Sequence, residues 1–133
     1  MGITHEGIDG EKWLMEEFRK KGIKVFQPDA ISLEKGAYVL NEVKHQEAYE
    51  PPPFRGHGLP IWQVQARLDF WRKTGVRARL IVKEKGTGDI YSQWLDVLES
   101  GARHDTHGKK PRRIYPLSSF RKRPSVNTRR KRD

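Results

Sequence analysis

An apolar segment from Ala37 to Lys44, with the sequence AYVLNEVK, is the feature that most restricts how this chain can fold. The segment is typical of a buried strand, yet it ends in Glu42-Val43-Lys44. Burying a carboxylate and an ammonium group is costly unless the two are paired or bind something. Residues i and i+2 of a strand point to the same side, so Glu42 and Lys44 should project together, with Val43 on the opposite face.

A second carboxylate, Asp29, follows Pro28 upstream of this strand. If Asp29 ends a neighbouring strand, two carboxylates and one lysine converge. Two hard oxygen ligands beside a cation suit a hydrated Mg²⁺ and a phosphodiester. The residues alone are equally compatible with an alternative that involves no metal. In that alternative, Glu42 and Lys44 are ordinary residues of an edge strand and Asp29 lies in a turn.

The remaining pattern predicts several further elements. Trp13, Leu14 and Phe18 are spaced as the apolar face of a helix that begins near Asp9 and ends at Gly22. We also expect short strands at 23–27 and 78–83, a helix at 61–74, a turn at 86–89, a short helix at 93–99, an edge strand at 113–116 and a long loop at 45–60. The order α-β-β-α-β favours an α/β sandwich around a mixed sheet.

Pro28-Asp29 together with Glu42-Val43-Lys44 resembles the motif of the PD-(D/E)xK nuclease superfamily. Segments 7–14 and 22–26 look like the opening helix and first strand of its Holliday junction resolvase branch, and segments 63–71 and 75–82 look like its next helix and strand. The resemblance implies an α/β fold with a restriction-endonuclease-like core, in which helices flank a mixed β-sheet. Residues 46–60 and the chain after residue 100 depart from the family.

The chemistry of the motif, together with the resemblance, points to catalytic roles for Asp29, Glu42, Lys44, Glu11 and Gln63. Asp29, Glu42 and the carbonyl of Val43 are the expected ligands of Mg²⁺, for which Mn²⁺ can substitute. Lys44 would orient the attacking water or stabilise charge that develops on the phosphate. Glu11 would touch the metal site, or else only stabilise the start of its helix. Gln63 falls where the resembling resolvases carry a glutamine, but it can equally lie on a solvated helix face.

The net charge of +10 is confined to the C-terminal segment. From Arg103 onward there are 12 Lys+Arg and 2 Asp+Glu, so the first 102 residues hold 15 of each (27 − 12 and 17 − 2). A neutral body with a cationic end favours a polyanionic partner over a tail that merely aids solubility. We expect DNA to contact Arg55, His57, Lys109, Lys110, Arg112, Arg113, Arg121, Lys122, Arg123, Arg129, Arg130, Lys131 and Arg132.

Residues 1–102 are therefore predicted to form a nuclease core, and residues 103–133 a basic, partly flexible segment. The absence of cysteine excludes disulfides and thiolate metal sites, and the sequence has no apolar run that suits a membrane span. We expect a cytoplasmic location and no membrane partner.

Three functions agree with the sequence. The leading one is a Mg²⁺-dependent, structure-selective DNA endonuclease, such as a Holliday junction resolvase that acts on branched DNA as a homodimer. The others are a general or nicking DNA endonuclease of phage or mobile-element type, and a non-catalytic basic protein that binds nucleic acid.

Overall fold

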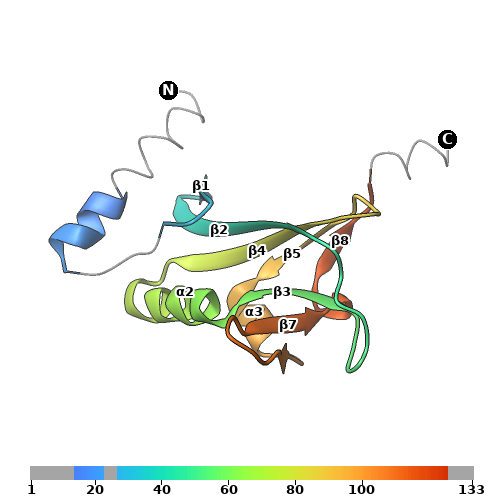
Figure 1. Cartoon of the computed structure of the whole chain (residues 1–133). Coiled ribbons are helices and arrows are strands. Elements are labelled where there is room, and N and C mark those ends of the chain that lie inside the picture. The colour runs from blue at the N-terminus through green and yellow to red at the C-terminus, as the bar shows by residue number, and fades with distance from the viewer. Residues whose placement is uncertain (1–13, 23–26, 126–133) are drawn as a thin grey trace.

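A five-stranded mixed sheet forms the centre of the molecule, as seen in the computed structural model, which describes residues 14–22 and 27–125 (Figure 1). The strand order is β1-β2-β4-β5-β8. The strands are β1 (Ala30–Glu34), β2 (Ala37–Gln46), β4 (Arg77–Glu84), β5 (Ile90–Trp94) and β8 (Arg121–Arg123). Strands β2 and β4 are parallel, whereas the other neighbours are antiparallel.

Helix α2 (Ile61–Thr74) makes the crossover that a parallel pair requires, because it precedes β4 and packs on the sheet. It ends at Gly75, which adopts a left-handed conformation with φ of 79°. A helical segment over residues 14–20 lies against α2, where Phe18 and Phe70 meet edge to face with ring centroids 4.7 Å apart. The short helix α3 (Leu95–Glu99) follows β5 directly.

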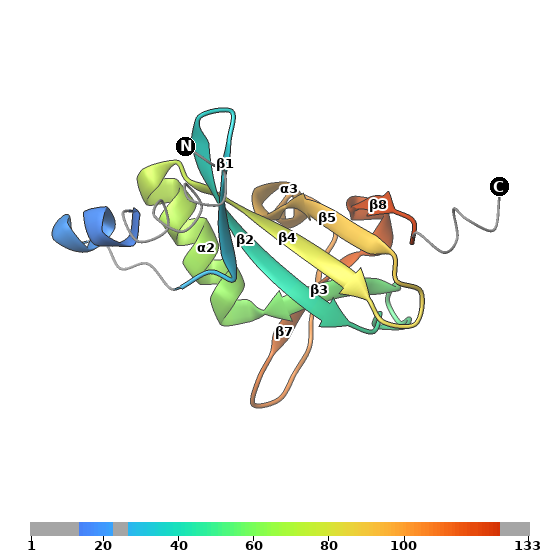
Figure 2. The same ribbon diagram turned by 90° about the horizontal axis from the view of Figure 1, so that it is seen from above.

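A second, three-stranded sheet has the order β3-β7-β6, from Gly56–Pro60, Arg112–Pro116 and His104–Asp105. The 3₁₀ turn η1 (Leu117–Ser119) links β7 to β8. Strand β3 lies very close to β7, since a Cβ added at Gly58 would collide with the carbonyl oxygen of Arg113. Figures 1 and 2 show this sheet, α2 and α3 on the same side of the five-stranded sheet, where the core lies.

The predicted α/β fold with a mixed sheet and flanking helices is confirmed. The helix at 61–74 has the predicted bounds, and the strands predicted at 37–44 and 78–83 are each slightly longer. The predicted strand at 23–27 falls mostly outside the described residues. None of the helices in the described ranges has the length and apolar character of a membrane span.

The chain after residue 102 differs from the expectation of a separate basic segment. Strand β7 pairs with β3, and β8 pairs with β5 of the main sheet. Residues 104–123 therefore belong to the folded body, and the predicted boundary does not coincide with a structural one. Strand β7 is also not an edge strand, because β3 and β6 lie on its two sides. Similarly, residues 56–60 of the expected loop form strand β3.

Candidate active site

Asp29 lies immediately before β1 and faces the edge of β2. Strand β1 pairs with β2 as far as Asn41, and no other strand of the described residues pairs with the next part of β2 on that side. There the backbone N–H of Val43 donates to Oδ2 of Asp29 at 2.8 Å. The N–H and C=O of a strand residue point to the same side, so the Val43 carbonyl is directed toward the same edge.

Glu42 is buried on the face of β2 that packs against α2, and Arg67 of that helix is its partner. Nε and one terminal nitrogen of Arg67 lie 2.6 and 2.5 Å from Oε1 of Glu42. Burial raises the pKa of Glu42, and the Arg67 guanidinium opposes this rise. The charge of Asp29 also raises this pKa, so the two carboxylates lie within electrostatic reach of each other.

Lys44 projects from the same face of β2 as Glu42 and meets the first turn of α2. Its Nζ donates to Oε1 of Gln63 at 2.9 Å. No carboxylate of the described residues lies within ion-pair distance of Lys44, so its charge is available to a ligand. The structure therefore brings Asp29, Glu42, Lys44 and Gln63 together in the C-terminal half of β2, and of the two positions that the sequence left open for Gln63 it shows the one beside Lys44.

Two carboxylate oxygens and one carbonyl are suited to a hard divalent cation. In the described part of the chain, Oδ1 of Asp29 and Oε2 of Glu42 accept no hydrogen bond. With the Val43 carbonyl, these oxygens offer the donor chemistry that Mg²⁺ prefers. The described residues contain no cluster of three acidic, histidine or cysteine side chains, so such a metal would also keep water ligands. Glu11, the other predicted contributor, lies outside the described residues.

Arg67 is the site residue that the sequence analysis missed. The residue is 2% exposed, and because an arginine is rarely buried without a partner, such burial points to a nearby anion. A signal was present in the sequence, because Arg67 follows Gln63 by one helical turn and stands three residues after Val64 in the apolar stripe of the helix. A cation inside such a stripe indicates a buried anion opposite it.

The structure corrects the prediction that His57 contacts nucleic acid. The ring is completely buried, with Nε2 2.7 Å from Oε2 of Glu84 and Nδ1 3.2 Å from Oε1 of Gln46. Burial lowers the pKa of His57, although Glu84 opposes this effect. Arg55 is half exposed and pairs with Glu50 and with Glu84.

The predicted basic contacts of the C-terminal region fall into several groups. Arg113 donates hydrogen bonds to Asp105 and Glu99, so its guanidinium group stabilises the fold and is not available to contact DNA. Arg112 is half buried and donates to the carbonyl of Gly58. Lys109, Lys110, Arg121, Lys122 and Arg123 are exposed, whereas Arg129, Arg130, Lys131 and Arg132 lie outside the described residues.

Comparison with known proteins finds similar solved structures but no match by sequence. No protein-family model matches the chain, and no curated protein matches its sequence. Among solved structures, it is similar to Archaeoglobus fulgidus Hjc, a Holliday junction resolvase from an archaeal hyperthermophile. The two are 20% identical, the match covers 86% of this chain and 87% of that chain, and the TM-score is 0.44.

Proposed function

We propose that this protein hydrolyses phosphodiester bonds in DNA, with Asp29, Glu42, Lys44 and Gln63 as its active site. The observation that carries the proposal is the meeting of two carboxylates with Lys44, which forms no ion pair with any described residue, in the C-terminal half of β2. A protein that only binds nucleic acid gains nothing from carboxylates that face phosphates, since like charges repel.

Each residue has a task that follows from its contacts. Asp29, Glu42 and the carbonyl of Val43 would hold Mg²⁺, which when bound neutralises phosphate charge and lowers the pKa of a bound water. Lys44 keeps two N–H groups beyond the one that Gln63 accepts, and these can donate to a phosphate oxygen or to the attacking water. Gln63 fixes the direction of that lysine. Arg67 fixes the carboxylate of Glu42 through its Oε1 and leaves Oε2 for the metal.

The favoured substrate is branched DNA, such as a four-way junction, cut by a homodimer. Such a dimer would place its two active sites on opposite strands, and its two-fold symmetry would match that of a four-way junction. The main alternative is a general or nicking DNA endonuclease with the same active site. Both share the chemistry and differ in substrate shape, so a single set of substrates separates them.

The experiment uses labelled linear, flapped and four-way DNA of matched sequence, each incubated with Mg²⁺, with Mn²⁺ or with chelator. It tests both the metal-dependent cleavage and the preference for branched DNA. We expect paired nicks near the branch point, slower cutting of linear duplex and no cutting in chelator. Equal cutting of linear and four-way DNA by a monomer in sedimentation would favour the general endonuclease.

Asp29→Asn, Glu42→Gln and Lys44→Ala should each lower the cleavage rate by on the order of 10²-fold or more, because each removes charge stabilisation from the transition state. Asp69→Asn is the matched control, since Asp69 is an exposed carboxylate of α2 that pairs with the exposed Lys73. DNA binding by the three site variants should survive. A Glu42→Gln protein that cuts at the parental rate would disprove the assignment.

A further inference from the structure

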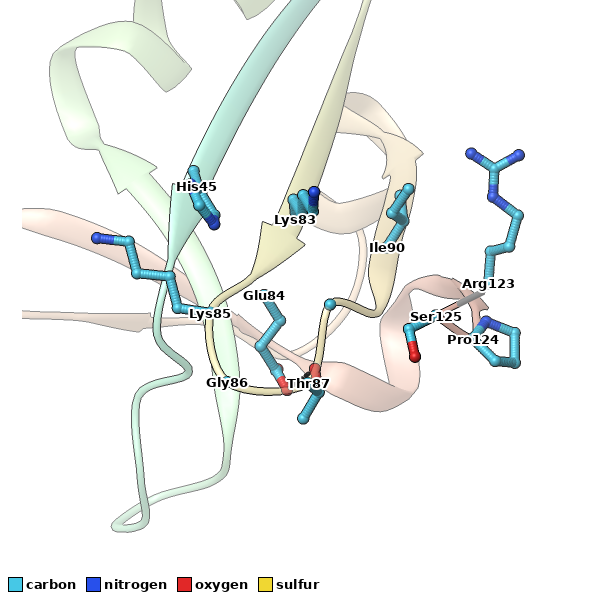
Figure 3. A pocket seen from close by; sticks show the side chains of 11 residues that line it. His45, Lys83, Glu84, Lys85, Gly86, Thr87, Ile90, Arg123, Pro124 and Ser125 are labelled. Atoms are coloured by element: carbon cyan, nitrogen blue, oxygen red, sulfur yellow. Dashed lines mark hydrogen bonds between the residues drawn. The ribbon is translucent and has the colours of Figure 1, made fainter. Parts of the chain in front are cut away.

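A row of four side chains, three of them basic, crosses the face of the five-stranded sheet opposite the core. In the strand register, His45 of β2 pairs with Lys83 of β4, Lys83 with Ile90 of β5, and Ile90 with Arg123 of β8. Paired residues of neighbouring strands lie on the same face, and Figure 3 shows His45, Lys83 and Ile90 side by side. With strands about 4.8 Å apart, the row spans roughly 14 Å.

This row lines a hollow together with the turn between β4 and β5 (Figure 3). His45, Lys83, Lys85 and Arg123 are all exposed. Within the described ranges, none of the four forms an ion pair with a carboxylate. Like charges on one small surface raise the energy of the free protein, so such a surface is suited to an anionic ligand.

Two acidic residues beside this hollow, Glu84 and Asp89, are turned into the protein. Glu84 is 1% exposed and accepts from His57 and from the hydroxyl of Thr87, with Arg55 3.5 Å away. Asp89 is also buried and accepts from the backbone N–H of Ser125 at 2.9 Å. The charges of Glu84 and Asp89 are therefore compensated inside the protein, whereas Lys83, Lys85 and Arg123 remain on its surface.

The hollow is continuous with the candidate active site. A second hollow beside it is lined by Lys44, Glu47 and Arg112, and it shares His45 and Lys85 with the first. Lys44 is the lysine proposed to meet the scissile phosphate. A chain of phosphates that leaves Lys44 along these two hollows would pass Lys85 and then reach the row of Lys83 and Arg123.

We infer that the hollow formed by Lys83, Lys85 and Arg123 binds the sugar–phosphate backbone of the DNA strand on one side of the cleaved bond. The inference rests on the proposed function for the position of the cut. It adds Lys83 and Lys85 to the DNA contacts and gives the bound strand a direction, from β2 across β4 and β5 to β8. Phosphates are the groups that such a row of point charges recognises, without regard to base sequence.

The test combines charge removal in the protein with charge removal in the DNA. The triple variant Lys83→Gln, Lys85→Gln, Arg123→Gln is compared with Lys20→Gln, Arg72→Gln, Lys73→Gln, which removes the same charge from exposed positions on two helices. Binding to a four-way DNA is measured in chelator as a function of salt. We expect the first variant to lower the log–log salt slope by about 0.9 for each lost phosphate contact, about 2.7 in all, and the second to leave it unchanged.

Single methylphosphonate linkages near the cut then locate the contacts. In the parental protein, neutral linkages on one side of the cut should weaken binding. The same linkages should have no further effect on the first variant, whereas the second should respond as the parental protein does. Equal salt slopes for both variants, or sensitivity of the first variant to every linkage, would overturn the inference.

The outcome is separable from that of the proposed function, because binding is read without cleavage. If the parental protein cuts no DNA but the first variant alone loses salt-dependent affinity, the active-site proposal fails and the hollow remains a phosphate site. If DNA is cut but the first variant binds like the second, the hollow is not on the path of the strand.

Discussion

At the scale of single residues, the pair of Glu42 and Arg67 determines the stability of the site as well as its geometry. Both side chains are at least nine-tenths buried. Removing one partner of such a pair leaves an uncompensated charge, which costs about 3–5 kcal/mol. We predict that Arg67→Met lowers the free energy of unfolding in urea by this amount, and that adding Glu42→Gln restores most of it.

Lys73→Met provides the matched control for this prediction. Lys73 and Asp69 form an exposed pair 3.0 Å apart on the same helix, and such pairs contribute less than about 1 kcal/mol. If Arg67→Met costs no more than Lys73→Met, the Glu42 carboxylate is not held by a desolvated ion pair. A double variant as unstable as Arg67→Met alone would point to lost packing of the arginine stem instead.

The sequence predicted the residues of the site better than their partners. The alternation of β2 placed Glu42 and Lys44 on one face, and the structure shows Asp29 and Gln63 in hydrogen-bond contact with this strand. Arg67 could not be assigned to Glu42 from periodicity, because that contact depends on how α2 lies across the sheet. His57 and Arg113 were interpreted as DNA contacts because nothing local reveals Glu84, Glu99 or Asp105 as their partners.

At the scale of elements, the buried contact between His57 and Glu84 joins β3 to β4 and therefore one sheet to the other. Because burial lowers the pKa of His57 below that of the unfolded chain, the unfolded state takes up the proton first as the pH falls. This contribution to stability is complete above about pH 6.5 and is lost as the pH drops toward the folded pKa.

We predict that the free energy of unfolding decreases below about pH 6.5 by up to about 1.4 kcal/mol per pH unit for this group, in addition to other titrations. His57→Gln should flatten that part of the profile. The measurement is urea unfolding from pH 7.5 to pH 5, with His45→Gln, an exposed histidine, as control. A gain in stability toward acid would indicate an imidazolium that donates to both Glu84 and Gln46.

Elements with local signals were predicted closely, whereas those that form by distant pairing were not. Gly75 ends α2 and the turn at 86–89 connects β4 to β5, so both could be located from nearby residues. Strand β3 has the sequence GHGLP, which resembles a loop, and it becomes a strand only because its glycines allow close approach to β7. The partner residues Gly58 and Ile114 lie far apart in the chain, and no local pattern connects them.

At the scale of the whole molecule, the basic C-terminal region contributes a strand to the main sheet. Strand β8 completes the main sheet by pairing with β5. Deleting residues 121–133 should therefore lower the thermal unfolding midpoint, whereas deleting residues 126–133 should leave it unchanged. Differential scanning calorimetry on the two truncated proteins checks this difference, and equal midpoints would show that β8 adds no stability.

The shorter deletion should change DNA binding alone. It removes Arg129, Arg130, Lys131 and Arg132, and each phosphate contact contributes about 0.9 to the log–log salt slope for duplex DNA. We expect a flatter slope and weaker binding at low salt, with cleavage at saturating protein preserved. An unchanged slope would place these four cations away from the DNA backbone.

The contacts that hold the start of α2 affect the order in which parts of the fold can form during synthesis. The backbone N–H of Ile61, at the start of the helix that carries Gln63 and Arg67, donates to the carbonyl of Pro111, and Pro60 pairs with Arg112. The site residues Asp29, Glu42, Lys44, Gln63 and Arg67 are all synthesised before Pro111 and Arg112, which hold the start of their helix. A growing chain can therefore pack α2 on β4 before it can form the contacts that fix the start of α2. Complete support of the helix then depends on β7, a strand that holds none of these five residues.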